Sequence, residues 1–90
     1  MTTITGITKD AGGNILGGVE IRFELAKPAA QSNGDVNLRS ISATSDSTTG
    51  AFSISVAPGK YDVIIDGDKV RNDVTIPDSE TYTLNQVITL

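Results

Sequence analysis

Two stretches of the chain alternate strictly between apolar and polar residues. Residues 19–25 place apolar side chains at odd positions and charged ones at even positions, and residues 52–56 alternate Phe, Ile and Val with serine. A period of two puts alternate side chains on one face of an extended chain. Each stretch therefore predicts a β-strand with one buried face, formed by Val19, Ile21, Phe23 and Leu25 in the first strand and by Phe52, Ile54 and Val56 in the second.

A Pro58–Gly59 pair separates the strand predicted at 52–56 from a further alternating stretch, residues 61–65, whose apolar positions are Tyr61, Val63 and Ile65. Proline suits the first central position of a type II turn, and glycine suits the second because that position needs a positive φ. The sequence therefore predicts a β-hairpin in which these two strands pair across a type II turn.

Turn-forming residues recur about every ten positions in the rest of the chain, which is the spacing typical of a β-sandwich. The apolar period changes between Leu38 and Ile41, which indicates a bulge or a break. Residues 27–35 have no apolar period and predict a long surface loop. The period of two continues to the last residue, so we expect a final strand and no helix. The expected strands are 3–9, 19–25, 36–44, 52–56, 61–65, 70–76 and 82–90.

These strands predict a single all-β domain spanning residues 1–90. The simplest arrangement is a seven-stranded antiparallel sandwich of two sheets, Ig-like or transthyretin-like in type. A chain of 90 residues builds a small core, so contact with a partner surface would add to its stability.

Composition excludes several classes of function. The net charge is −4 and the seven basic residues are scattered, whereas nucleic-acid binding needs clustered lysine and arginine. No apolar run is long enough to span a membrane. The N-terminal residues 1–6 have neither the basic start nor the apolar core of a signal peptide. We therefore expect neither nucleic acid nor a membrane as a partner, and we expect synthesis in the cytoplasm.

Catalytic chemistry has few candidates in this sequence. The chain contains no histidine and no cysteine, which removes the usual base of a nucleophilic triad and any thiolate metal site. Glu20 and Glu24 could pair as acid and base, but strand parity places both on the outer face. We expect no enzymatic activity and no cofactor.

An acidic cluster offers a weak calcium candidate, formed by Asp66, Asp68 and Asp73. Calcium takes six to eight oxygen ligands from a loop that wraps the ion, and this spacing does not match the EF-hand loop. Asp66–Gly67 is also a strong hairpin-turn dipeptide. The turn is the favoured interpretation.

Both ends of the chain and the 27–35 loop are the expected interaction surfaces. The segment 87–90 is apolar on both faces, which fits either a buried edge strand or pairing with a neighbouring subunit. The loop is longer than a hairpin needs, and such loops often carry contacts. The candidate contact residues are Thr2, Thr3, Ala29, Gln31, Asn33, Val87, Ile88 and Leu90.

Two segments resemble known families. Residues 4–21, beginning Ile-Thr-Gly-Ile-Thr-Lys-Asp, and residues 49–63, with Thr-Gly-Ala-Phe before Pro-Gly-Lys-Tyr-Asp-Val, resemble the opening and the central hairpin of carboxypeptidase-regulatory-like (transthyretin-like) sandwiches. Within that group the opening is most similar to the N-terminal domain of phage tail fibres. The resemblance implies a non-enzymatic domain that docks onto a virion.

The expected function is therefore that of a phage structural protein located in the virion. It would decorate or cement a capsid or tail, or anchor a fibre, with other virion proteins or further copies of itself as partners. The alternative is a surface- or carbohydrate-binding Ig-like module of a bacterial extracellular protein. Sugar sites usually need exposed aromatic rings, and the four aromatic residues fall on apolar parities.

Overall fold

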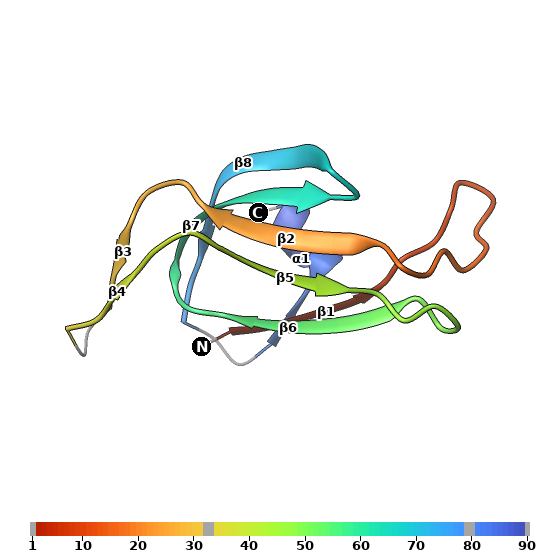
Figure 1. The fold of residues 1–90 in the computed structure, drawn as a ribbon, viewed down its shortest axis with the longest axis horizontal. Helices are drawn as coiled ribbons and strands as arrows, with labels where there is room; N and C mark the ends of the chain where they lie inside the picture. Colours follow the sequence, from red (N-terminus) through yellow and green to blue (C-terminus); the bar gives the residue numbers. More distant parts are fainter. Residues whose placement is uncertain (1, 32–33, 79–80, 90) are drawn as a thin grey trace.

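The computed structural model describes residues 2–31, 34–78 and 81–89, and this part of the chain is mostly β-structure (Figure 1). Most of the connections between the strands are short, apart from the one between β1 and β2, which spans residues 8–19, and a helix of five residues lies near the end of this part of the chain. The elements are β1 (Thr2–Ile7), β2 (Glu20–Leu25), β3 (Ala29–Ala30), β4 (Val36–Asn37), β5 (Ser40–Thr44), β6 (Ala51–Val56), β7 (Gly59–Ile65), β8 (Asp68–Ile76), β9 (Thr81–Thr83) and α1 (Leu84–Ile88).

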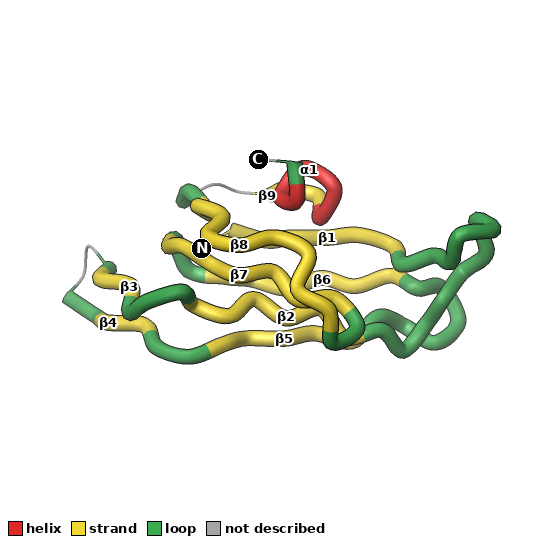
Figure 2. Tube along the Cα trace, turned by 90° about the horizontal axis from the view of Figure 1, so that it is seen from above, coloured by secondary structure: helices red, strands yellow, loops and turns green. Residues whose placement is uncertain are grey.

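The expectation of seven antiparallel strands in two sheets is not confirmed. The described residues form nine strands in three sheets, ordered β6-β1-β9, β5-β2-β7-β8 and β3-β4. The pairing of β1 with β9 is parallel, with Thr3 opposite Thr81. The additional sheet is a small hairpin of β3 and β4 that projects from one end of the molecule (Figures 1 and 2). Strand β3 of this hairpin lies in the 27–35 segment, which was expected to be a long surface loop.

The two larger sheets share one core. The alternation predicted in β2 and β6 is confirmed, because Ile21 and Phe23 of β2 and Ile54 and Val56 of β6 are all buried. The ring of Phe23 meets the edge of the Tyr61 ring, with 6.0 Å between centroids and an interplanar angle of 81°. Burial of each such side chain stabilises the fold by about 1.5–3 kcal/mol.

The predicted hairpin at Pro58–Gly59 is wrong. β6 and β7 do not pair; β6 belongs to the three-stranded sheet and β7 to the four-stranded sheet. Gly59 is not among the residues with positive φ, so the connection is not a type II turn. β6 keeps the expected alternation of buried side chains. In β7, Tyr61 and Val63 are buried as expected, but Ile64 is buried as well and Ile65 only partly. Ala57 and Pro58 carry the chain from one sheet to the other.

The Asp66–Gly67 turn is a true hairpin. Asp66 has φ 54° and Gly67 has φ 83°, and positive values at both central positions are what a type I′ turn requires. The turn joins β7 to β8, and the pairing register of these two strands shifts on either side of Val63. The turn interpretation of this acidic segment is therefore confirmed.

The predicted final strand over residues 82–90 is also wrong. After the short β9 the chain turns into α1, and the side chains of Leu84, Val87 and Ile88 pack on the core at helical spacing. Thr83 caps the helix: its hydroxyl accepts a hydrogen bond from the Gln86 N–H, while the Gln86 side chain accepts one from the Thr83 N–H. This capping box satisfies two backbone donors that a helix start leaves open.

The bulge or break predicted between Leu38 and Ile41 is a break. β4 ends at Asn37, β5 begins at Ser40, and Arg39 between them has φ 73°. A left-handed residue at this point ends one strand and turns the chain into the next, because a strand cannot continue through a positive φ.

Candidate docking surface

Edge strand β5 presents unpaired backbone groups on one side of the molecule. It pairs antiparallel with β2, with Ser42 opposite Arg22. Ser45 N–H donates to the Val19 carbonyl at 2.9 Å, and Leu25 N–H donates to the Arg39 carbonyl at 2.9 Å. Hydrogen-bonded pairs alternate along an antiparallel ladder, so the odd residues of β5 bond to β2. The N–H and C=O groups of Ser40, Ser42 and Thr44 therefore point away from the sheet.

Edge strand β6 offers a second, shorter row of such groups. It pairs with β1, and Thr8 N–H donates to the Gly50 carbonyl at 2.9 Å. The even residues of β6 therefore bond to β1, and the backbone of Ser53 and Ser55 points outward. The Ala51 carbonyl already accepts a hydrogen bond from Asp46 N–H at 2.8 Å.

β5 and β6 lie in contact along the same side of the molecule (Figures 1 and 2). Neither strand contains a charged residue or a proline, since their sequences are Ser-Ile-Ser-Ala-Thr and Ala-Phe-Ser-Ile-Ser-Val. Natural edge strands usually carry charges, prolines or bulges that prevent pairing with another chain. We call these two strands together the neutral edge.

The opposite side of the molecule is protected. The edge strand β8 carries Asp68, Lys69, Arg71 and Asp73 and has an irregular register. The other edge strand there, β9, has three residues. Helix α1 contacts both strands, and an Arg71 Nη1–H donates to the Ile88 carbonyl at 2.8 Å. The charges on β8, the short length of β9 and helix α1 together protect this side of the molecule against pairing with another strand. The neutral edge has no such protection from its own strands.

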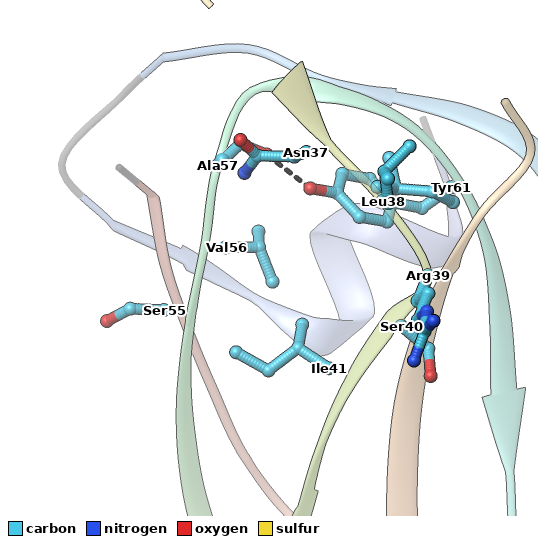
Figure 3. Close-up of a pocket in the computed structure, with 10 residues that line it drawn as sticks. Asn37, Leu38, Arg39, Ser40, Ile41, Ser55, Val56, Ala57 and Tyr61 are labelled. Atoms are coloured by element: carbon cyan, nitrogen blue, oxygen red, sulfur yellow. Dashed lines mark hydrogen bonds between the residues drawn. The ribbon is translucent and has the colours of Figure 1, made fainter. Parts of the chain in front are cut away.

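A small apolar cleft opens at one end of the neutral edge (Figure 3). Its volume is about 100 Å³. Leu38 and Ile41 on its rim expose 62% and 42% of their surface. On the other wall, the Tyr61 hydroxyl donates to the Ala57 carbonyl at 2.7 Å. The cleft has room for one apolar side chain of a partner. Its lining comprises Leu25, Asn37, Leu38, Arg39, Ser40, Ile41, Ser55, Val56, Ala57 and Tyr61.

Opposite charges flank β5 along the chain. Arg39 precedes the strand and is exposed, and it forms no ion pair within the described part of the chain. Asp46 follows the strand and is also exposed. Hydrogen bonds from the N–H groups of Thr49 and Thr48 to its carboxylate lower the pKa of Asp46, so this carboxylate stays charged at neutral pH.

Two of the expected contact residues serve the core instead. Thr2 is fully buried, and its hydroxyl donates to the Pro77 carbonyl. Val87 is fully buried, because residues 84–88 form a helix and Val87 lies on its inner face, packed into the core. Neither side chain can reach a partner in this fold. Thr3 and Ile88 are half-buried, and Asn33 and Leu90 lie outside the described residues.

The expected loop contacts lie on and beside the β3–β4 hairpin. Ala29 is half-buried at its base. Gln31 N–H donates to the Asp35 carbonyl at 2.8 Å and its Nε2 donates to the Pro58 carbonyl at 3.1 Å. Gln31 therefore links the β3–β4 hairpin to the crossover between the two larger sheets, and its side-chain amide N–H already donates a hydrogen bond within the domain.

Asp66, Asp68 and Asp73, the weak calcium candidate, are not part of a cluster of metal-ligating side chains in the described part of the chain. Among residues 2–31, 34–78 and 81–89, no three acidic, histidine or cysteine side chains come together as a metal site would need. Asp66 sits in the hairpin turn, and Asp73 N–H donates to Asp62 Oδ1 at 3.0 Å. That bond, followed by the one from Lys69, lowers the pKa of Asp62.

Within the described ranges no helix has the length and apolar character needed to cross a bilayer. Comparisons of the chain with protein-family models, with curated proteins and with solved structures found no match.

Proposed function

We propose that this chain is a non-enzymatic structural protein of a phage virion that docks on a capsid or tail surface. It acts either as a decoration or cement protein or as the anchoring domain of a fibre. The proposal includes an Ig-like, transthyretin-like sandwich built from the two larger sheets, as in the carboxypeptidase-regulatory-like domains that the sequence resembles. The virion assignment rests on that resemblance, and the docking mode rests on the surface.

The observation that supports docking is the neutral edge beside its apolar cleft. Open backbone groups on Ser53 and Ser55 can accept a partner strand, and main-chain hydrogen bonds then provide affinity. The cleft next to Ser55 and Val56 takes an apolar side chain of that strand and so provides selectivity. A partner that adds a strand to β6 would extend the three-stranded sheet.

The alternative, a carbohydrate-binding module, has less support. Phe23, Phe52 and Tyr61 are buried, and Tyr82 is half-buried against the core. A sugar ring stacks on an exposed aromatic face, and none of these four rings offers one.

Purified particles of the phage that carries the gene would test the proposal. Quantitative mass spectrometry should find the chain at a fixed ratio to the major capsid or tail protein, and particles that lack it should bind the purified chain at saturable sites. Capsid or tail genes beside its gene would agree with this. Absence of the chain from particles, or a gene within a glycan-utilisation locus, would contradict the virion assignment.

A further inference from the structure

We propose that β5 is a self-association edge: two copies of this chain pair their β5 strands antiparallel about a two-fold axis at Ser42. This inference deepens the proposed docking function, because it names a second copy as the occupant of half of the neutral edge. Pairing would join the two four-stranded sheets into one continuous sheet of eight strands.

The hydrogen-bonding pattern of β5 permits this register. In an antiparallel pair about Ser42, residue numbers of opposed residues add to 84, so Ser40 of one copy lies opposite Thr44 of the other and the two Ser42 residues face each other. These are the residues whose N–H and C=O groups point away from β2. This register therefore pairs the backbone groups of every outward-facing residue of β5. A register shifted in either direction pairs fewer of them.

The side chains of β5 raise no barrier to a symmetric pairing. At a two-fold axis the same residue of both copies lies close together, so a charged residue at the centre of the strand would be repelled by its counterpart in the second copy. The central residue here is an exposed serine, and Ile41 faces Ala43 of the second copy. Edge strand β8 lacks this property, since charged residues run along it and its register is irregular.

Charge complementarity favours a second copy as the occupant. The same register places Arg39 opposite Ser45 of the second copy, one residue away from Asp46, and two-fold symmetry repeats this arrangement at the other end. Arg39 forms no ion pair within the described residues, and the lowered pKa of Asp46 keeps its carboxylate charged at neutral pH. A symmetric pairing of β6 has no such contact, because no charged residue flanks it closely at either end.

The interface is small. A five-residue strand gives a contact in the size class of weak, transient complexes, below about 1,200 Å². We therefore expect a monomer in dilute solution and a dimer at high local concentration. Arrays of copies on a particle provide that concentration.

Disulfide trapping tests the register directly, because the chain contains no cysteine. The Ser42→Cys variant brings two thiols opposite each other, with Cα atoms about 5.5 Å apart as in a hydrogen-bonded pair, a separation that a disulfide spans. In the matched control Ser40→Cys the two thiols stand more than about 13 Å apart, four strand positions away. Ser53→Cys on β6 is a second control.

In a glutathione redox buffer we expect the disulfide-linked dimer of Ser42→Cys to exceed those of both controls at least tenfold. Sedimentation of the unmodified chain should show a concentration-dependent dimer that Arg39→Glu weakens. Thermal melts confirm that each variant is folded. Equal trapping of all three variants, preferential trapping of Ser53→Cys, or a strict monomer at millimolar concentration would overturn the pairing. A chain that pairs in this way but is absent from particles would contradict only the virion assignment.

Discussion

The Tyr61 hydroxyl donates a hydrogen bond to the Ala57 carbonyl at 2.7 Å, and this bond holds the crossover between the two larger sheets. Tyr61 lies near the start of β7, and Ala57 follows the last residue of β6. Both residues are buried. The bond therefore fixes the point at which the chain leaves one sheet and enters the other.

Replacing Tyr61 with phenylalanine should lower the free energy of unfolding by about 1–3 kcal/mol, because it leaves a buried carbonyl without its donor. Urea denaturation of both proteins measures the difference. Tyr82→Phe is the control, since the Tyr82 hydroxyl makes no hydrogen bond within the described residues. A loss equal to that of the control would show that the bond does not stabilise the crossover.

The close approach of the β1–β2 connection to the β5–β6 turn depends on Gly17. A Cβ at this position would lie 2.4 Å from Ser47 Cα and 2.5 Å from the Asp46 carbonyl oxygen. Backbone atoms cannot move aside as a side chain can, so Gly17→Ala should destabilise the fold by about 1–3 kcal/mol. In the control Gly12→Ala the new Cβ meets only side-chain atoms, at 3.2 and 3.3 Å.

Thermal or urea unfolding of these two alanine variants measures the contrast. We expect Gly12→Ala to stay within about 0.5 kcal/mol of the unmodified chain, as surface changes usually do. Equal stability of the two variants would mean that the two connections can separate without loss.

Acid should weaken the β5–β6 turn through Asp46. Its folded-state pKa lies below the ordinary value of 3.8 because it accepts hydrogen bonds from Thr49 and Thr48 N–H. A lowered folded pKa stabilises the fold at pH values above the ordinary pKa, and this stabilisation is lost as the pH falls through the folded value. The free energy of unfolding should therefore fall on acidification, and less steeply in Asp46→Asn.

Urea denaturation at a series of pH values from about 6 to about 2 measures this dependence. Asp68→Asn is the control, because Asp68 is exposed and accepts no hydrogen bond within the described residues. An unchanged slope in Asp46→Asn would assign the acid sensitivity to other carboxylates.

The faces of the strands could be predicted from sequence, but their partners could not. Alternation in residues 52–56 correctly indicates which side chains are buried. In residues 61–65 it does so for Tyr61 and Val63 but not for Ile64, which is buried next to the register shift at Val63. The alternation contains no information on whether two successive strands pair or cross the core, and a Pro-Gly dipeptide is compatible with both. The helix was missed for a different reason. Apolar residues at 82, 84, 88 and 90 mimic a period of two, whereas Leu84, Val87 and Ile88 together have helical spacing. Thr83 and Gln86 have the spacing of a capping box, and this signal could have predicted the start of the helix from the sequence.

The neutral edge could not be located from sequence, because being an edge is a property of topology. The uncharged strands at 40–44 and 51–56 are visible in the chain, but the same composition suits a central strand equally well. The order of the strands within the two larger sheets shows that β5 and β6 are edge strands. Contact surfaces were instead expected at the chain ends and in the 27–35 loop, and at the chain ends Thr2 and Val87 are buried.

Blocking the outer edge of β6 should weaken docking while leaving the fold intact. The N–H of Ser53 points away from β1, so a proline there removes no bond of the ladder, and proline is compatible with edge strands. Ser53→Pro deletes the donor offered to a partner strand and places a ring in its path. We expect at least a tenfold loss of affinity for particles that lack the chain.

Ser53→Ala is the matched control, since it keeps the backbone donor and should bind as the unmodified chain does. Urea denaturation shows whether both variants remain folded. If folded Ser53→Pro binds particles normally, the partner does not add a strand to β6 and uses another surface of the domain. If Ser53→Ala alone lost affinity, the serine hydroxyl rather than the backbone would be the recognised group. Strand addition is supported only if Ser53→Pro loses affinity for the particles and Ser53→Ala keeps it, because the two variants differ in whether the backbone N–H is present.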